Sequence, residues 1–453
     1  MLCLEAVAAS DVHRDVHRAT EAIFRIESAR LIAGLARIVR DVGLAEELAQ
    51  DALVLALERW PLSGVPDNPG AWLMATAKHR AIDDLRRRQV FERKHAELGH
   101  AFEARQAEAT QAVQDAIEEA IEDDVGDDLL RLVFTACHPI LPPEARVALT
   151  LRLVGGLGTA EIARAYLVAE PTIAQRIVRA KRTLTAAGVP FALPSKEERA
   201  ARLLSVLEVI YLIFNEGYAA TAGDDWMRPE LCQDALRLGR ILAGLVPQEP
   251  EVHGLVALME IQASRIGART DVTGAPILLL DQNRACWDRL LIQRGLTALE
   301  LALRQGDGRG PYTLQAAIAA CHARARTAQE TDWPGIVALY ATLAEVAPSP
   351  IVELNRAVAV TMASGPAAGL ALVDALVASR ALAEYPLLPA VRGDCLEKLG
   401  RREEARTEFE RAAALTRNAR ERWVLHARAA ACTQAPAGNL GEVRANSVGK
   451  LGH

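Results

Sequence analysis

Apolar residues recur along most of the chain at intervals of three and four, the spacing that places them on one face of an α-helix. The alternating β-branched and aromatic residues typical of strands are scarce. The pattern therefore predicts an all-α fold. The first helical block extends from about residue 15 to residue 90 and carries two such stripes, through Ile23, Ile26, Leu31, Leu35 and Ile38, and through Leu44, Leu48, Leu53, Leu55 and Leu57.

A loop at residues 60–70 interrupts this block. It contains three prolines and two glycines, so we expect no helix to run through it. Asn68 can cap the next helix, which Pro69 can start and which extends to about residue 88. Residues 89–127 are polar and predict a solvated linker. The acidic residues of this region gather at Glu118, Glu119, Glu122, Asp123, Asp124, Asp127 and Asp128.

A second compact block, residues 128–186, ends in two helices joined by a short turn. Thr159 can cap the first of these helices, which buries Ile162 and Ala163, and Glu170 can cap the second. In the second helix, an apolar stripe through Ile173, Ile177 and Leu184 turns the opposite face toward solvent. That outer face carries Thr172, Gln175, Arg176, Arg179 and Arg182.

The outer face of this second helix has the chemistry of a DNA reader. Arginine can bond guanine in a bidentate manner and glutamine can bond adenine, whereas threonine and lysine can hold backbone phosphates. The arrangement therefore predicts a helix-turn-helix that binds duplex DNA. The segment leaves open the alternative of an amphipathic helix pair with a solvated basic face.

Composition fits a helical protein of several domains. The 453 residues are 51% hydrophobic and only 4% aromatic. A net charge of -6 is unusual for a DNA binder, but Arg86–Arg88 and Arg179–Arg182 concentrate positive charge locally, and local fields govern binding. The chain lacks a basic start followed by an apolar stretch, and no run is long enough to cross a bilayer. We therefore expect a cytoplasmic protein without membrane contact.

The seven cysteines are far apart and odd in number, which argues against a disulfide framework and predicts buried thiols. Enzyme chemistry has little support. His13 and His17 can share a helix face and Cys137 adjoins His138, but neither pair has a third group nearby in sequence. We expect no catalytic residue, no metal and no cofactor. Candidates for binding a nucleotide or small ligand, with buried structural ion pairs as the alternative, are Asp281, Asn283, Arg284 and Trp287.

The last third of the chain shows an internal repeat of about 34 residues. Its three copies resemble tetratricopeptide units, helical hairpins that stack on one another. An irregular helical bundle is the alternative. The residues that align are Thr331–Trp333 with Tyr340, Leu343 and Pro348; Gly365–Ala367 with Leu372; and Gly400–Ala405 with Phe409 and Ala412, preceded by Gly393 and Leu396.

The order of the segments resembles a known family. An acidic helix at residues 41–51, a basic helix at residues 72–88, a linker and a helix-turn-helix are similar to the bacterial sigma-70 superfamily, specifically to extracytoplasmic-function sigma factors. Leu132–Pro139, Glu161–Val168, Tyr211–Tyr218 and Leu280–Arg284 resemble the subgroup with a long C-terminal extension. The predicted domains are region two at 10–90, a linker at 91–127, region four at 128–190, a helical extension at 196–310, tetratricopeptide-like repeats at 311–435 and a tail at 436–453.

The resemblance implies a sigma factor that binds core RNA polymerase and promoter DNA and directs transcription initiation. It implies polymerase contacts at Asp41, Glu46, Glu47 and Asp51. It implies contacts to the separated strand of the -10 element at Ser63, Asn68, Trp72, Lys78, His79, Arg80 and Arg87. It implies contacts to the -35 element at Thr172, Gln175, Arg176, Arg179, Lys181 and Arg182.

The extension is the main departure from ordinary members of this class, which end soon after region four. Roughly half of the chain follows here, so we expect a regulatory extension that packs against the sigma domains or receives a partner protein or peptide. A competing hypothesis from another class is a helical-repeat scaffold or peptide-binding protein without transcription activity. It predicts no polymerase association and no salt-dependent DNA binding.

Overall fold

The computed structural model describes residues 2–96, 125–166, 168–220, 222–223, 225–271 and 276–433. It is helical nearly throughout, which confirms the all-α expectation. Its contacts divide the chain into two compact units, unit 1 at Met1–Val209 and unit 2 at Ile210–His453. Within the described ranges, no helix combines the length and the apolar character needed to cross a membrane.

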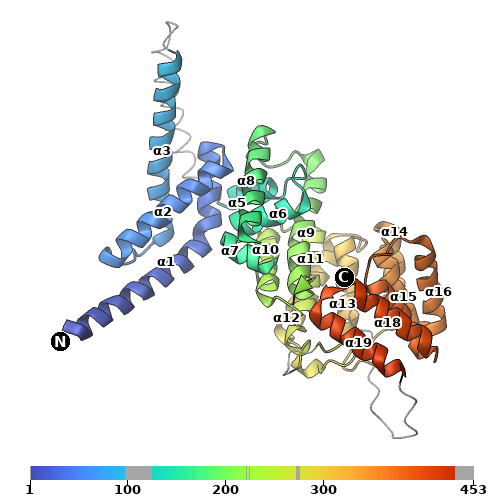
Figure 1. Cartoon of the computed structure of the whole chain (residues 1–453). Coiled ribbons are helices and arrows are strands. Elements are labelled where there is room, and N and C mark those ends of the chain that lie inside the picture. Colours follow the sequence, from blue (N-terminus) through green and yellow to red (C-terminus); the bar gives the residue numbers. More distant parts are fainter. Residues whose placement is uncertain are drawn as a thin grey trace. The chain divides into compact units, whose positions relative to one another are not determined.

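Unit 1 opens with three helices that contact one another (Figure 1). Asp41 caps the second helix by accepting a hydrogen bond from the Leu44 amide at 2.9 Å, and Asn68 caps the third by accepting from the Ala71 amide at 3.1 Å. The predicted cap at Asn68 is therefore confirmed. The three helices are α1 (Leu2–Val39), α2 (Val42–Ser63) and α3 (Pro69–Ala96).

The boundaries of these helices differ from expectation in two places. Helix α2 passes through Pro61 and ends at Ser63, so the break is shorter than predicted and falls at Gly64, whose φ of 82° leaves the helical region. Helix α3 continues beyond residue 88 to Ala96. One member of the first stripe was also wrong, because Ile26 is 70% exposed.

The buried face of α2 consists mainly of alanines, which let the helices approach closely. Trp60 near its end is 1% exposed and fills the space beneath α3, where Leu73 is equally buried. Glu46 lies on the same buried face. The small buried residues of α2 are Ala45, Ala49, Ala52 and Ala56.

The second part of unit 1 contains four helices, two of which form the predicted helix-turn-helix. The Glu161 carboxylate accepts a hydrogen bond from the Gly158 amide at 2.6 Å, so Thr159 starts its helix and does not cap it. Glu170 is likewise the first residue of the second helix, because Ala169 holds the cap position. The four helices are α5 (Val125–Ala136), α6 (Pro143–Leu153), α7 (Thr159–Ala165) and α8 (Glu170–Ala186).

Asp128 was wrongly placed in the solvated acidic run. It lies in α5, is 5% exposed and forms ion pairs with Arg37 at 3.2 Å and Arg131 at 2.6 Å. Most of the predicted linker, residues 97–124, lies outside the described residues. Asp128 therefore joins α5 to α1 within unit 1.

Helix α9 (Lys196–Tyr218) spans the boundary between the units. Its first part is held on α5 and α6. Arg146 donates to Ser205 Oγ at 2.5 Å and to Glu208 Oε2 at 3.0 Å, and Ser205 donates to the Cys137 carbonyl at 2.7 Å. Residues 196–209 thus complete unit 1, although they follow the helix-turn-helix in sequence.

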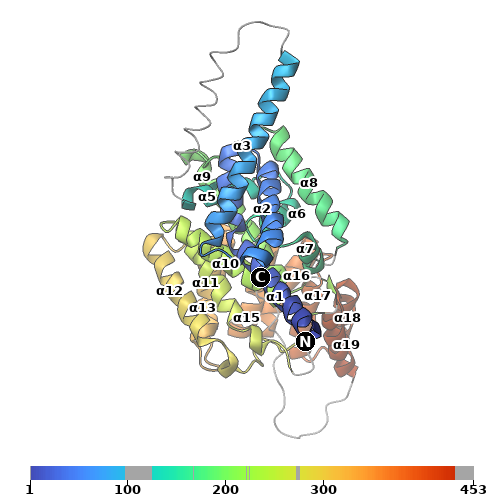
Figure 2. The same ribbon diagram turned by 90° about the vertical axis from the view of Figure 1, so that its left-hand side faces the viewer.

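Unit 2 begins with helices gathered around a buried central helix, α11, as Figures 1 and 2 show. Glu251 in α11 caps α13 by accepting from the Tyr312 amide at 2.8 Å and the Thr313 amide at 3.0 Å. The elements are α10 (Pro229–Leu245), α11 (Pro250–Ala263), η1 (Ile266–Ala268), η2 (Arg284–Cys286), α12 (Arg289–Gln305) and α13 (Pro311–Arg324).

Six further helices follow, and each contacts the next in sequence. Alternate helices start at residues 333, 366 and 402, so the spacings are 33 and 36 residues and agree with the predicted period. The assignment to tetratricopeptide units stays a prediction. The helices are α14 (Trp333–Val346), α15 (Pro350–Ser364), α16 (Pro366–Ser379), α17 (Leu387–Lys398), α18 (Arg402–Leu415) and α19 (Ala419–Thr433).

A short parallel contact closes unit 2. Strand β1 (Ala222–Gly223) pairs with β2 (Arg417–Asn418). The Asn418 side-chain amide also donates to the Ala220 carbonyl at 3.1 Å and to the Asp225 carbonyl at 2.9 Å. The end of the repeats is therefore tied to the loop that follows α9.

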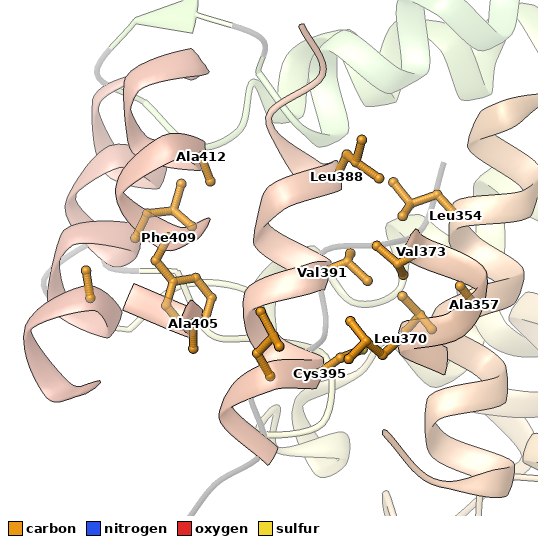
Figure 3. Close-up of a cluster of buried hydrophobic side chains, with 14 of the residues drawn as sticks. Leu354, Ala357, Leu370, Val373, Leu388, Val391, Cys395, Ala405, Phe409 and Ala412 are labelled. Carbon is orange, nitrogen blue, oxygen red and sulfur yellow. The ribbon is translucent and has the colours of Figure 1, made fainter. Parts of the chain in front are cut away.

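Helices α17 and α18 approach closely at Gly393, which faces Phe409, a residue of the apolar cluster in Figure 3. A Cβ atom there would lie 2.7 Å from the ring of Phe409, which is fully buried. We expect Gly393→Ala to destabilise unit 2 by about 1–3 kcal/mol, lowering its thermal midpoint by about 2–4 °C per kcal/mol. Gly244→Ala is the control, because a Cβ there meets nothing within 4 Å. Equal midpoints for the two variants would contradict the packing described.

Candidate nucleic-acid interface

Helix α8 presents two different faces. Its buried residues are Ile173, Ile177, Ala180 and Leu184, which confirms the predicted stripe and adds Ala180 to it. Arg176 is half-buried on the edge of this stripe. Among the described residues, no carboxylate pairs with Arg176, Arg179 or Arg182. The exposed residues are Thr172, Gln175, Arg179 and Arg182.

Lys181 departs from this pattern. Its ammonium group forms an ion pair with Glu46 of α2, and its side chain is 20% exposed. Glu46 is itself 5% exposed, and its Oε1 atom accepts from Arg152 Nε of α6 at 2.5 Å and from Gln50 Nε2 at 3.0 Å. In this arrangement Lys181 faces protein and not solvent, and Glu46 is not a surface acid.

Two further polar contacts join the first three helices to the second part of unit 1. Thr185 of α8 donates to Asp41 Oδ2 at 3.4 Å, and Arg37 of α1 pairs with Asp128 of α5. Helices α1 and α2 therefore pack against α5, α6 and α8 within unit 1. Because two cations share one buried carboxylate, loss of that carboxylate would leave positive charge without compensation.

The remaining acids of α2 are on the surface. Glu47 is exposed, and Asp51, with 58% of its side chain exposed, pairs with Arg80 of α3 at 2.7 Å. Arg80 is 40% exposed, so this pair is a surface salt bridge and contributes little to stability. Both side chains remain accessible to other partners.

The loop between α2 and α3 is accessible over most of its length. Ser63 and Asn68 are exposed, and the Ser63 hydroxyl donates to the Arg59 carbonyl at 3.1 Å. Trp72 packs edge-on against the buried Trp60 ring, with 5.4 Å between the ring centres. This contact fixes the indole of Trp72 at the start of α3, next to the loop.

The predicted basic residues of α3 occupy different environments. His79 is exposed. Burial lowers the pKa of Lys78, repulsion by Arg37 lowers it further, and Asp128 opposes the shift. Lys78 thus lies near the contact of α1 with α5. Arg87 belongs to α3, but its side chain is outside the described ones.

Cys137 and His138 do not form a nucleophile and base. Burial raises the pKa of the Cys137 thiol to about 12, and its Sγ atom lies 3.2 Å from Thr150 Oγ1. The His138 ring accepts a hydrogen bond from the Ile140 amide at 3.1 Å. Burial, aided by Arg202 and opposed by Glu198, lowers the pKa of His138. The pair shapes the turn between α5 and α6. The side chains of the other pair, His13 and His17, lie outside the described ones.

The cysteines differ in access, and the expectation of buried thiols was wrong for Cys286, which is exposed in the short turn η2. Cys137 and Cys232 are buried, and burial raises both thiol pKa values to about 12. We expect iodoacetamide at pH 8.5 to alkylate Cys286 within minutes while Cys137 and Cys232 stay unmodified until the protein unfolds, because the thiolate is the nucleophile. Peptide mass spectrometry over a time course measures this. Early alkylation of Cys137 would contradict its burial.

Comparison with known proteins gives a match for each part of unit 1. Residues 24–90 match Sigma-70 region 2, and residues 131–184 match Sigma-70, region 4. Residues 202–303 match a family of unknown function, DUF6596. An uncharacterized protein of Rhizobium meliloti (strain 1021) is 44% identical over 394 residues, which cover 86% of this chain and 90% of that protein. No solved structure matches.

These matches coincide with the helices that carry the candidate interface. The region 2 match contains α2, the loop and most of α3, and the region 4 match contains the helix-turn-helix. The chain therefore belongs to the sigma-70 family, in the two-region form of extracytoplasmic-function members, with a C-terminal extension. The family supports a role in promoter recognition, with core RNA polymerase and promoter DNA as partners, and it is not an enzyme family.

Proposed function

We propose that the chain is a sigma factor that binds core RNA polymerase, directs initiation at a specific class of promoters, and is regulated through its extension. The observation that carries the proposal is the helix α8. It buries an apolar stripe against α6 and α7 and leaves Thr172, Gln175, Arg179 and Arg182 exposed. No carboxylate of the described part of the chain pairs with these arginines. This face has donors for both base edges and phosphates of a -35 element.

The loop and the start of α3 suit a separated DNA strand. Exposed Ser63 and Asn68 offer hydrogen-bonding groups, and Trp72 offers an aromatic surface beside them. Capturing an unstacked base there would offset part of the stacking energy lost when the -10 element melts. In this proposal His79 and Arg87 of α3 contact the strand, whereas Arg80 must first exchange its partner Asp51.

The proposed polymerase surface is divided by the packing of unit 1. Glu47 and Asp51 are accessible, but Asp41 and Glu46 contact region four. We infer that the free protein is closed and that polymerase binding separates region two from region four. In the closed state Glu46 and Lys181 pair with each other. In the open state Glu46 would contact the polymerase and Lys181 would contact DNA phosphates.

The extension is proposed to regulate this opening. Arg146, Ser205 and Glu208 connect region four to α9, and α9 continues into unit 2 as one helix. A signal received by unit 2 therefore has a direct covalent and helical connection to region four. The repeats at 311–435 provide the surface proposed for a partner protein or peptide.

Association with core polymerase tests the proposal. We expect the purified full chain to sediment with bacterial core polymerase, and a truncation after Val209 to bind more tightly if the extension restrains opening. The cut belongs after Val209, because Ser205 and Glu208 complete the packing of region four. If neither protein binds polymerase or DNA in a salt-dependent manner, the helical-repeat scaffold becomes the better explanation.

A further inference from the structure

Three arginines of unit 2 are buried among aromatic rings, two of which flank Arg265. Arg265, Arg269 and Arg284 are 6%, 6% and 8% exposed. The guanidinium carbon of Arg265 lies 5.8 Å from the ring centres of both Tyr218 and Trp287. That of Arg269 lies 3.5 Å from the Tyr218 ring, and that of Arg284 lies 5.0 Å from the Trp287 ring. Cations and rings therefore alternate, with Arg265 in the middle.

One carboxylate, that of Glu330, attracts Arg284 without forming an ion pair with it. Within the part of the chain that the structure describes, none of the three arginines forms an ion pair. Burial lowers the pKa of Arg269 and of Arg284, and Arg265 contributes repulsion to both shifts. Removing three like charges from water without a directly paired counter-ion is costly, because aromatic faces compensate only part of the lost hydration.

Two of the arginines have hydrogen-bond acceptors among the described residues, whereas Arg265 has none there. Arg284 donates to the His322 carbonyl at 2.6 Å, the Ala325 carbonyl at 2.8 Å and Thr331 Oγ1 at 3.1 Å. Arg269 donates to the Tyr218 carbonyl. The Arg265 side chain makes no hydrogen bond or ion pair among the described residues, and its Nε atom is fully enclosed.

We propose that Arg265 binds the phosphate group of a small anionic ligand, with Arg269 and Arg284 supplying charge on either side. A guanidinium has five N–H donors in a planar fork, and a phosphate offers several oxygens and up to two negative charges in the matching geometry. A single carboxylate would leave more of the positive charge unbalanced. Tyr218 and Trp287 provide flat apolar surfaces next to the anion. All five residues of the site lie within residues 202–303, the segment that matches DUF6596.

Calorimetry and thermal unfolding of the full chain test this site with inorganic phosphate, pyrophosphate and ATP at constant ionic strength. We expect saturable binding of at least one probe and a rise of about 5 °C or more in the midpoint of unit 2 at a hundredfold excess over Kd. Pyrophosphate binding as tight as ATP binding would identify the phosphate chain as the ligand, and tighter ATP binding would add the nucleoside. Binding of all three weaker than about 1 mM overturns the proposal.

Arg265→Met separates a ligand site from a structural one. If Arg265 serves a ligand, the variant loses the probe effect and keeps or raises the midpoint without ligand, because an unpaired buried charge is replaced by an apolar chain. If the arginine only stabilises the aromatic rings, the midpoint falls and any probe effect survives. Arg304→Met is the control, since Arg304 is exposed on α12. The binding site does not depend on the proposed sigma function. The binding result can therefore be interpreted even if the protein fails in transcription assays.

Discussion

Replacing Glu46 by glutamine is expected to separate region two from region four in the free protein. The carboxylate of Glu46 is 5% exposed and is shared by Arg152 and Lys181. Glutamine keeps the shape but removes the charge, so two largely buried cations lose their partner. Removing one partner of a buried ion pair lowers stability by about 3–5 kcal/mol. Because both cations are partly exposed, we expect a loss near the lower end of this range. Solution scattering should show a larger radius of gyration.

Glu47→Gln is the matched control, because Glu47 is on the same helix and is exposed. It should leave the radius of gyration unchanged. If the two variants scatter alike, the Glu46 contact does not hold the domains together and the closed state is wrong.

Arg152→Gln extends the test to activity. Arg152 is assigned to neither DNA nor polymerase, so its loss weakens the closed state without removing a proposed contact of the open state. We expect Arg152→Gln to raise initiation at limiting polymerase, whereas Glu46→Gln gains less because Glu46 also serves the open complex. A drop in initiation for Arg152→Gln would contradict an inhibitory closed state.

Replacing Arg179 by alanine is expected to weaken recognition of the -35 element by about 1–3 kcal/mol, or about 5- to 150-fold in affinity. Arg179 is exposed on the outer face of α8 and pairs with no carboxylate in the ranges that the structure describes. Its loss should therefore leave the fold intact. Fluorescence anisotropy on a duplex that carries the element measures the change, and discrimination between related sequences should fall with affinity.

The control for charge alone is Arg199→Ala, which removes an equally exposed arginine from α9. It should weaken binding slightly and equally for all sequences, as a change in the general field does. If Arg179→Ala behaves in the same way, α8 holds DNA only through its charge and does not read sequence.

The sequence predicted the local features of the candidate interface well. Asn68 caps α3, and Ile173, Ile177 and Leu184 are buried, because both features depend on residues within one or two helical turns. The predicted caps at Thr159 and Glu170 were wrong by one position each. The Glu161 carboxylate accepts a hydrogen bond from the Gly158 amide, so that helix starts with Thr159, and Ala169 holds the cap position before Glu170.

The pairing of Glu46 with Lys181 could not be predicted, since 135 positions separate the two residues and the contact depends on how two helical blocks pack. Helical spacing nevertheless indicates that both residues lie on buried faces of their helices. Glu46 falls among the buried alanines of α2, and Lys181 follows Ile177 by four positions. A charge on an apolar stripe indicates a buried partner and not a surface contact.

The arginine cluster of unit 2 shows the same limit. Tyr218, Arg265 and Trp287 come from three separate segments, and only the fold brings their side chains together. The sequence predicted part of this site, because Arg284 and Trp287 were among the candidates for ligand binding. No motif marks Arg265 in the sequence, because a single arginine at the end of a helix is common. Only the structure shows that its buried Nε atom has no hydrogen-bond acceptor among the described residues.

Run-off transcription with bacterial core polymerase on a pooled promoter library tests the central claim most directly. We expect the full chain, or the truncation after Val209, to produce discrete starts that share two upstream elements. Arg179→Ala should weaken these starts strongly and Arg199→Ala should preserve them. The absence of new starts with both the full chain and the truncation, under conditions where another sigma factor is active, would contradict the proposal that this protein directs initiation.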